Sequence, residues 1–190
     1  EYDMERFRLG DSPILYPNVN WYDYLMNKAA VQTQHNVSIS GGTKDIRYFV
    51  SLGFLYQNGL FKQLDGLDYN NNYSYTRYNY RANLDVNLTR TTTLKFGMGG
   101  IVGNQRDPGG SGNVWKQLTW SLPFSSPGIV DGKKVMTQST RFPGVKMENQ
   151  VFNGFYGYGY DRKVSNNMTF DLNLSQNLDC ITKGLSIEVK

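Results

Sequence analysis

Residues 76–88 alternate without a break between two kinds of side chain, and this alternation constrains the fold more than any other feature. One parity holds Thr76, Tyr78, Tyr80, Ala82, Leu84, Val86 and Leu88, and the other holds Arg77, Asn79, Arg81, Asn83, Asp85 and Asn87. Successive side chains of a β-strand point to opposite faces of its sheet. The segment therefore predicts a long strand with one apolar face and one polar face.

The same period of two recurs along the chain and predicts six strands. They cover about 34–41, 45–57, 75–89, 92–103, 164–178 and 184–190. The connections between them alternate between short and long, which is typical of an up-and-down barrel with tight turns on one side and large loops on the other. This organisation gives four segments: an outer loop at 1–33 with a short helix at about 20–30, four barrel strands at 34–103, a long outer loop at 104–163, and two further strands at 164–190, the last one truncated.

Alternation alone does not separate a membrane barrel from a water-soluble sheet, because both have one apolar and one polar face. The strands are long enough to cross a bilayer at a tilt, which takes about 9–11 residues. Aromatic residues gather at the predicted outer ends of two strands, as in an interfacial girdle; they are Phe54, Tyr56, Tyr78 and Tyr80. Both features favour an all-β segment of a large antiparallel transmembrane barrel.

The alternative function is a soluble or surface-attached β-sheet binding module, such as a lectin-like adhesin. A purely structural interpretation, an assembly intermediate or barrel fragment, also stays open. Monodisperse folding without detergent is the behaviour that would favour the soluble module.

Composition and motifs exclude several other classes. The 20 Lys and Arg exceed the 16 Asp and Glu by only four and form no run of five, so the sequence predicts no nucleic-acid surface. His35 is the only histidine and Cys180 the only cysteine, and neither belongs to a cluster with metal-ligand spacing. The glycines at 97–103 miss the spacing of a phosphate-binding loop. We expect no enzyme activity, no cofactor and no metal site.

A succession of short motifs carries a resemblance to a known family. They are Trp21-Tyr22-Asp23, Asn36-Val37-Ser38-Ile39-Ser40-Gly41-Gly42, Tyr48-Phe49-Val50-Ser51-Leu52-Gly53-Phe54, Gln57-Asn58-Gly59 and Arg77-Tyr78-Asn79-Tyr80-Arg81-Ala82-Asn83-Leu84-Asp85. In order and spacing they resemble the early barrel of the SusC/RagA family of TonB-dependent outer-membrane transporters of the Bacteroidetes. The resemblance covers about 16–100 and returns at 164–178.

The resemblance implies a piece of a larger importer in the outer membrane of a Gram-negative bacterium. Such barrels have roughly 22 strands around a plugged lumen, so about six strands would lie here. The implied partners are the protein's own plug domain, TonB through parts absent from this chain, a SusD-like surface lipoprotein, membrane lipid, and an oligosaccharide or oligopeptide substrate.

Two sets of residues are candidates for contacts within such a transporter. The first set lies on the polar parity and consists of candidate lumen or plug contacts; it comprises Arg77, Arg81, Asp85 and Asp171, with Lys95 and Lys163. The alternative is that these side chains line a solvated wall without a specific role. Aromatic residues in the long loop are candidate substrate or lid contacts, because aromatic rings stack on sugar faces and grip peptide side chains. They are Trp115, Trp120, Phe155, Tyr156, Tyr158 and Tyr160, and the alternative is packing among the loops.

Overall fold

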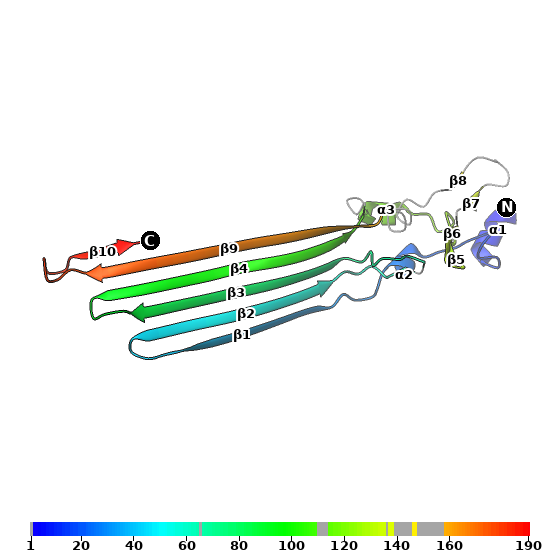
Figure 1. The fold of residues 1–190 in the computed structure, drawn as a ribbon. Helices are drawn as coiled ribbons and strands as arrows, with labels where there is room; N and C mark the ends of the chain where they lie inside the picture. Colours follow the sequence, from blue (N-terminus) through cyan, green and yellow to red (C-terminus); the bar gives the residue numbers. More distant parts are fainter. Residues whose placement is uncertain (1, 65, 110–113, 136, 139–145, 148–157) are drawn as a thin grey trace. The chain divides into compact units, whose positions relative to one another are not determined.

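The computed structural model describes residues 2–64, 66–109, 114–135, 137–138, 146–147 and 158–190 (Figure 1). The chain forms two compact units. We call one the sheet unit, which comprises Gln32–Gln57, Tyr75–Gln105 and Lys163–Lys190. We call the other the loop unit, which comprises Glu1–Val31, Asn58–Ser74 and Arg106–Arg162.

Six strands form one sheet with the order β1-β2-β3-β4-β9-β10. Their bounds are Gln32–Gly42 for β1, Ile46–Asn58 for β2, Ser74–Asn87 for β3, Thr92–Pro108 for β4, Tyr160–Asn177 for β9 and Ser186–Val189 for β10. β1 pairs with β2 and β9 with β10 in antiparallel fashion, as short turns between neighbouring strands require. The six strands expected from the alternation are confirmed, and the sheet stays open between β1 and β10.

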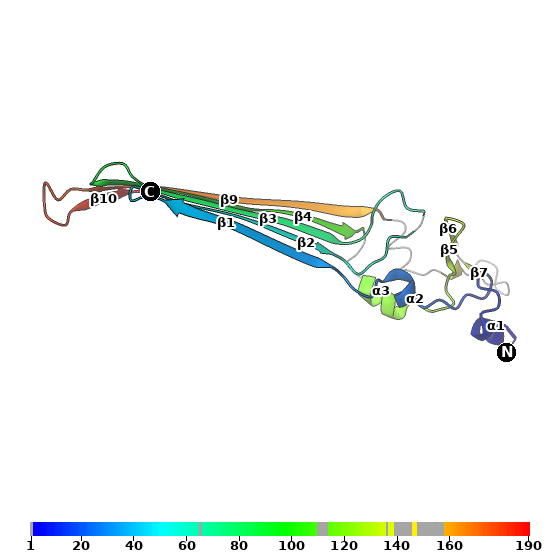
Figure 2. The same cartoon turned by 90° about the horizontal axis from the view of Figure 1, so that it is seen from below.

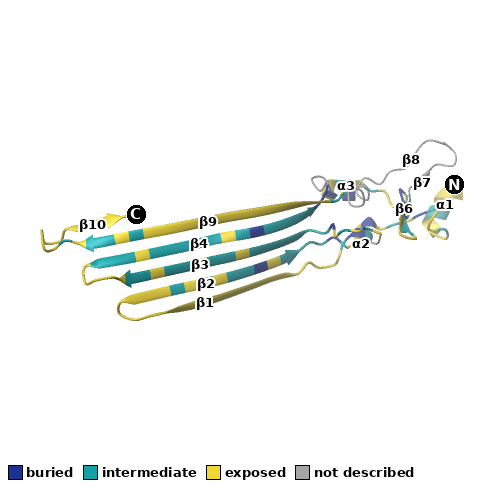
Figure 3. Ribbon diagram, viewed as in Figure 1, coloured by how far each residue is buried: buried dark blue, intermediate teal, exposed yellow. Residues whose placement is uncertain are grey.

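The sheet is a single thin layer, as Figure 2 shows when it is viewed almost along its plane. The register between β1 and β2 places Val37 opposite Leu52 and Ile39 opposite Val50, so the apolar side chains of the two strands share one face. These side chains are exposed, with 63% of Val37 and 59% of Leu52 accessible (Figure 3). The regular alternation therefore builds two faces without a buried hydrophobic cluster, and among the described residues of the sheet unit Leu55 alone is a buried hydrophobic side chain.

The loop unit contains the buried hydrophobic cluster. Its elements are the helices α1 (Tyr2–Leu9), α2 (Trp21–Leu25) and α3 (Val114–Trp120), the hairpin of β5 (Gly128–Val130) with β6 (Lys133–Val135), and the pair of β7 (Thr137–Gln138) with β8 (Lys146–Met147). Three separate stretches of sequence supply the cluster, which comprises Trp21, Leu25, Phe61, Leu64, Val114 and Leu118. Trp21 also donates its indole N–H to the Leu122 carbonyl at 3.0 Å.

Two expectations about this unit need correction. The helix expected at 20–30 ends at Leu25, because Met26 is extended and forms a β-bridge with Phe61. The side-chain amide nitrogen of Asn27 also donates a hydrogen bond to the Phe61 carbonyl. The expected loop at 104–163 is shorter and partly structured, since β4 continues to Pro108 and β9 begins at Tyr160. Asn20 caps α2, its side chain accepting from the backbone N–H groups of Tyr22 and Asp23.

No helix in the part of the chain that the structure describes is both long and apolar enough to span a membrane.

Candidate functional site

The polar face of the sheet unit collects most of the charged and amide side chains of the strands. The polar residues and glycines of this face are Asn36, Ser38, Arg47, Ser51, Gly53, Arg77, Asn79, Arg81, Asn83, Asp85, Lys95, Gly97, Gly99, Asn167, Thr169, Asp171 and Asn173. The apolar side chains of Phe49, Leu55 and Ile101 share the same parity. Contacts across strands confirm the shared face: Arg47 pairs with Asp85 at 3.8 Å, and Gly97 lies beside Asn83 and Asp171.

Two shallow hollows lie on this face. The first has a volume of about 440 Å³ and the second about 450 Å³, and both are lined by Arg81, Asn83, Gly97 and Asp171. Asn79, Gly99, Asn167 and Thr169 complete the polar lining of the first. Arg47, Asp85, Lys95 and Asn173 belong to the second.

Three of the four predicted polar residues therefore come together. Arg81 and Asp171 line both hollows, and Asp85 lines the second with Lys95. Arg77, like Lys163, is on the polar parity but is not among the residues that line either hollow. The spacing along one strand could not reveal this grouping, because Asp171 reaches Arg81 only through the pairing of β3, β4 and β9.

The charges of the hollows nearly balance. Arg47, Arg81 and Lys95 supply three positive charges, and Asp85 and Asp171 supply two negative ones. The Arg47–Asp85 pair is solvent-accessible, so it contributes about 0–1 kcal/mol to stability. Such a surface offers hydrogen-bond donors and acceptors side by side, and neither sign of charge dominates its electrostatic potential.

The apolar face carries the four aromatic residues predicted as a girdle. The Phe54 ring lies between two others, stacked on His35 at 6.4 Å and tilted against Tyr78 at 5.4 Å. Tyr56 and Tyr80 share the parity of Phe54 and Tyr78, and the Tyr80 ring covers the position where Gly100 lacks a side chain. His35 thus belongs to an aromatic cluster with Phe54 and Tyr78.

The aromatic candidates of the long loop fall into separate places within the loop unit. Trp115 contacts Phe61 at 5.5 Å between ring centroids, whereas Trp120 is 73% exposed and has the Lys116 ammonium 5.0 Å from its ring centroid. Both tryptophans belong to α3. Phe155 and Tyr156 lie outside the described residues.

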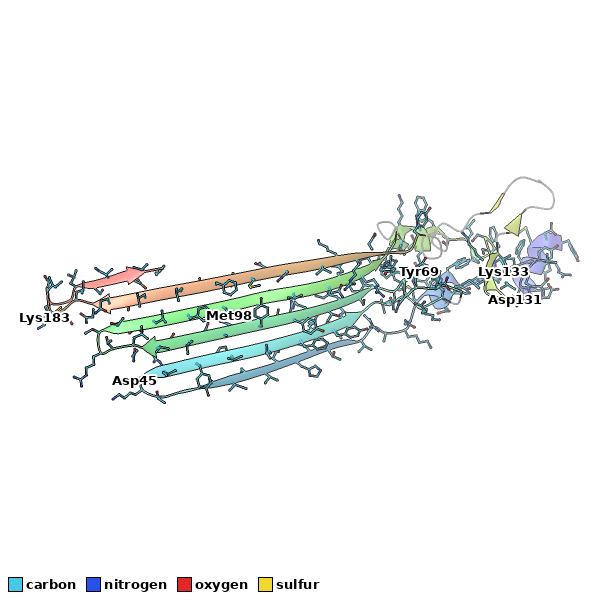
Figure 4. All side chains as sticks on the ribbon, viewed as in Figure 1. Asp45, Tyr69, Met98, Asp131, Lys133 and Lys183 are labelled. Atoms are coloured by element: carbon cyan, nitrogen blue, oxygen red, sulfur yellow. The ribbon has the colours of Figure 1, made fainter. Side chains whose placement is uncertain are left out.

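Tyr158 and Tyr160 are near the start of β9. Tyr158 is exposed, while the Tyr160 ring packs on Tyr69 at 5.9 Å and lies under the Arg106 guanidinium at 4.6 Å. Figure 4 labels Tyr69 and shows it in this part of the loop unit. Sequence reasoning missed Tyr69 and Arg106, because only the fold brings residues from 58–74 and from the end of β4 to the start of β9.

The described residues hold no group of three or more His, Cys, Asp or Glu side chains placed to bind a metal ion. The chemistry that the polar face offers is hydrogen bonding and ion pairing with a ligand or another protein surface.

Comparison with known proteins gives partial matches. No family model matches the chain. TonB-dependent receptor P26 of Formosa agariphila is 27% identical over 123 residues, which are 64% of this chain and 11% of that protein. TonB-dependent receptor SusC of Bacteroides thetaiotaomicron is 47% identical over 45 residues, 24% of this chain and 4% of that protein. The chain thus spans about a tenth or less of the length of these relatives.

The structure of the RagAB peptide transporter has a similar fold. It aligns with a TM-score of 0.58 and 18% identity, covering 93% of this chain and 19% of that chain. At this identity the likeness concerns the fold and not the function. Together the matches confirm the resemblance to the SusC/RagA family, and the fold class of an open antiparallel segment of a barrel transporter is confirmed with it.

Proposed function

We propose, from this relationship to SusC/RagA-type TonB-dependent receptors, that the chain forms part of the wall of an outer-membrane importer of oligomeric nutrients. The observation that supports this proposal most directly is the single-layer sheet with one exposed apolar face. Val37, Leu52, Phe170 and Leu172 are each at least 59% accessible on that face. Proteins in water rarely leave so continuous an apolar surface open.

Lipid is the solvent that suits this face. β1 has 11 residues, β2 has 13, β3 has 14, β4 has 17 and β9 has 18, whereas a tilted strand needs about 9–11 residues to cross the hydrocarbon layer. The aromatic cluster of His35, Phe54 and Tyr78 suits the boundary between hydrocarbon and head groups. A water-soluble binding module would need a second layer on the apolar face, and the sheet unit is a single layer.

The polar face would then line an aqueous lumen. Arg81, Asp85 and Asp171 would contact the substrate path or a plug domain of the same protein, since a barrel of this family is wide enough to need one. The substrate would bind outside, and plug movement driven through TonB would open the lumen. No bond of the substrate is made or broken in this mechanism.

The loop unit would face the outside and meet a SusD-like lipoprotein or the substrate. Support comes from α3, where Trp115 and Trp120 stay 56% and 73% exposed although Val114 and Leu118 of the same helix are buried. Aromatic residues that remain exposed on an ordered helix are the usual anchors of protein and sugar contacts.

Uptake by intact cells tests the proposal directly. A strain lacking the gene for the whole protein should lose growth on one complex oligosaccharide or peptide mixture and keep growth on the corresponding monomers. The protein should sediment with the outer membrane. Unchanged growth on every oligomer tested, or a protein found in the soluble fraction, would overturn the importer assignment.

A further inference from the structure

The pairing of β4 with β9 keeps one register along both strands, which lie side by side in Figure 1. At one end the Asn177 N–H donates to the Thr91 carbonyl at 2.8 Å. At the other end the Gly109 N–H donates to the Gly159 carbonyl, also at 2.8 Å. Counting along the strands from either end gives the same partners, so the pairing contains no bulge and the residue opposite each position of β4 is fixed.

Two arginines meet across this strand pair. Arg106 of β4 lies directly opposite Arg162 of β9. Arg106 has the parity of Met98, and Arg162 has the parity of Phe170, so both have the parity of the apolar face. A contact supports this placement, since the Arg106 guanidinium lies 4.6 Å from the ring centroid of Tyr160, which has the parity of Arg162. We call these two residues the arginine pair.

The arginine pair is unfavourable for strand pairing alone, because like charges directly opposite each other destabilise a strand pair. The acidic neighbours of the two arginines, Asp107 and Asp161, have the opposite parity. The strands therefore present positive charge side by side on the apolar parity. An anion held between the two guanidiniums would turn this repulsion into attraction.

The order of side chains along β9 matches the layers of a lipid leaflet. Apolar residues of this parity continue up to Val164, whose side chain is 61% exposed. Arg162 follows two residues further on, which is about 7 Å along a strand. The head-group layer of a bilayer is about 5–8 Å thick on each side of the hydrocarbon. If the apolar face meets lipid, the arginine pair therefore lies at the level of the head groups.

Aromatic residues hold one of the two arginines in place. The Tyr160 ring under the Arg106 guanidinium packs on Tyr69 at 5.9 Å between ring centroids. The Tyr69 hydroxyl in turn accepts from the Gly159 N–H at 3.1 Å. Arg106 is half-buried in this setting, whereas Arg162 is exposed. One guanidinium is thus already oriented, and the other is accessible from outside.

We propose that the arginine pair binds the phosphate group of a phosphorylated lipid in the outer leaflet, whose acyl chains lie along the apolar face. Guanidinium forks bind phosphate oxygens two at a time through charge-assisted hydrogen bonds. Two of them match the roughly 1.5–2 negative charges of a phosphate monoester near neutral pH. The apolar side chains below the pair bind the acyl chains, which free phosphate lacks. The proposal rests on the proposed outer-membrane function, and it adds a lipid site on the outside of the barrel wall.

Lipid binding by the purified, delipidated full-length protein tests this proposal. The probes are bisphosphorylated lipid A, the same lipid after enzymatic removal of its phosphates, and inorganic phosphate, each titrated in detergent and followed by native mass spectrometry. The test variant is Arg106→Gln with Arg162→Gln. The control is Lys44→Gln with Arg90→Gln, which removes the same charge at two exposed positions in the short turns. Heat-modified migration in gel electrophoresis verifies that both variants form their barrel.

The wild-type protein and the control should bind the phosphorylated lipid with equal affinity, and the dephosphorylated lipid more weakly. The arginine variant should bind the phosphorylated lipid at least about tenfold more weakly, as expected for the loss of charged hydrogen bonds. Three results would overturn the proposal: the arginine variant binds as tightly as the control, the wild-type protein does not distinguish the two lipids, or inorganic phosphate binds as tightly as the phosphorylated lipid.

The lipid site and the importer function can fail separately. A protein that stays in the outer membrane and imports its nutrient, but binds phosphorylated lipid equally well in the arginine variant, removes the site alone. A protein of the outer membrane that imports no oligomer removes the importer function, while the lipid titration still reports on the arginine pair.

Discussion

The position of each residue in the alternation decides which environment its side chain meets. Asn83 and Leu84 are neighbours in β3, yet one lines the hollows of the polar face and the other belongs to the apolar face. A one-residue shift of register would exchange these environments for the entire strand. Substitutions at neighbouring positions should therefore differ strongly in effect.

Arginine placed on the two faces of β3 makes this difference measurable. Leu84→Arg should destabilise the assembled barrel by about 2–4 kcal/mol, since the charge would face hydrocarbon near the bilayer centre. Asn83→Arg should leave assembly unchanged within about 0.5 kcal/mol, because its side chain meets water. Urea titration of the full-length protein in lipid vesicles measures both. Equal losses at the two positions would contradict the assignment of the faces.

At the scale of elements, the strands were predictable and the loop unit largely was not. Alternation is a local property, so 45–57 and 75–89 predict β2 and β3 to within a few residues. The end of α2 depends on Phe61, which is distant in sequence and pairs with Met26. The helices α1 and α3 were not predicted, and α3 is held by a core assembled from three separate stretches.

The candidate site on the polar face was likewise predictable from the sequence only in part. The parity of Arg81 and Asp171 follows from the sequence, and so does their shared face. Their meeting in one hollow depends on the pairing of β3, β4 and β9, which no single segment encodes.

The buried cluster of the loop unit should behave as a cooperative core. Leu118 is 2% accessible in that cluster, so Leu118→Ala should destabilise the loop unit by about 2–5 kcal/mol through lost burial and a cavity. Trp120→Ala is the matched change on the same helix, and it should cost less than about 0.5 kcal/mol because Trp120 is exposed.

Hydrogen exchange of the full-length protein separates these two variants. Leu118→Ala should speed exchange of the backbone amides around α2 and α3, and Trp120→Ala should not. Similar exchange in both variants would show that Leu118 does not belong to a stabilising core.

At the scale of the whole molecule, the exposed face of α3 becomes a prediction about assembly. Truncating a central aromatic anchor typically weakens an interface by about 2 kcal/mol or more. Trp120→Ala should therefore reduce the amount of surface lipoprotein that co-purifies with the full-length protein. Tyr22→Ala, at an exposed aromatic position outside the candidate lid contacts, serves as the control and should leave co-purification unchanged. Undiminished co-purification with Trp120→Ala would exclude this tryptophan as an anchor.

The central claim is that one face of the sheet meets lipid and the other meets water. Nitroxide labels on single cysteines at 49, 50, 51 and 52, introduced into a full-length protein whose native cysteines, Cys180 among them, are replaced by serine, test this most directly in outer-membrane vesicles. Collision with oxygen, which concentrates in lipid, should be greater at 50 and 52, and collision with a water-soluble nickel chelate should be greater at 49 and 51. Chelate access at all four positions would contradict the claim, because it would place both faces of β2 in water.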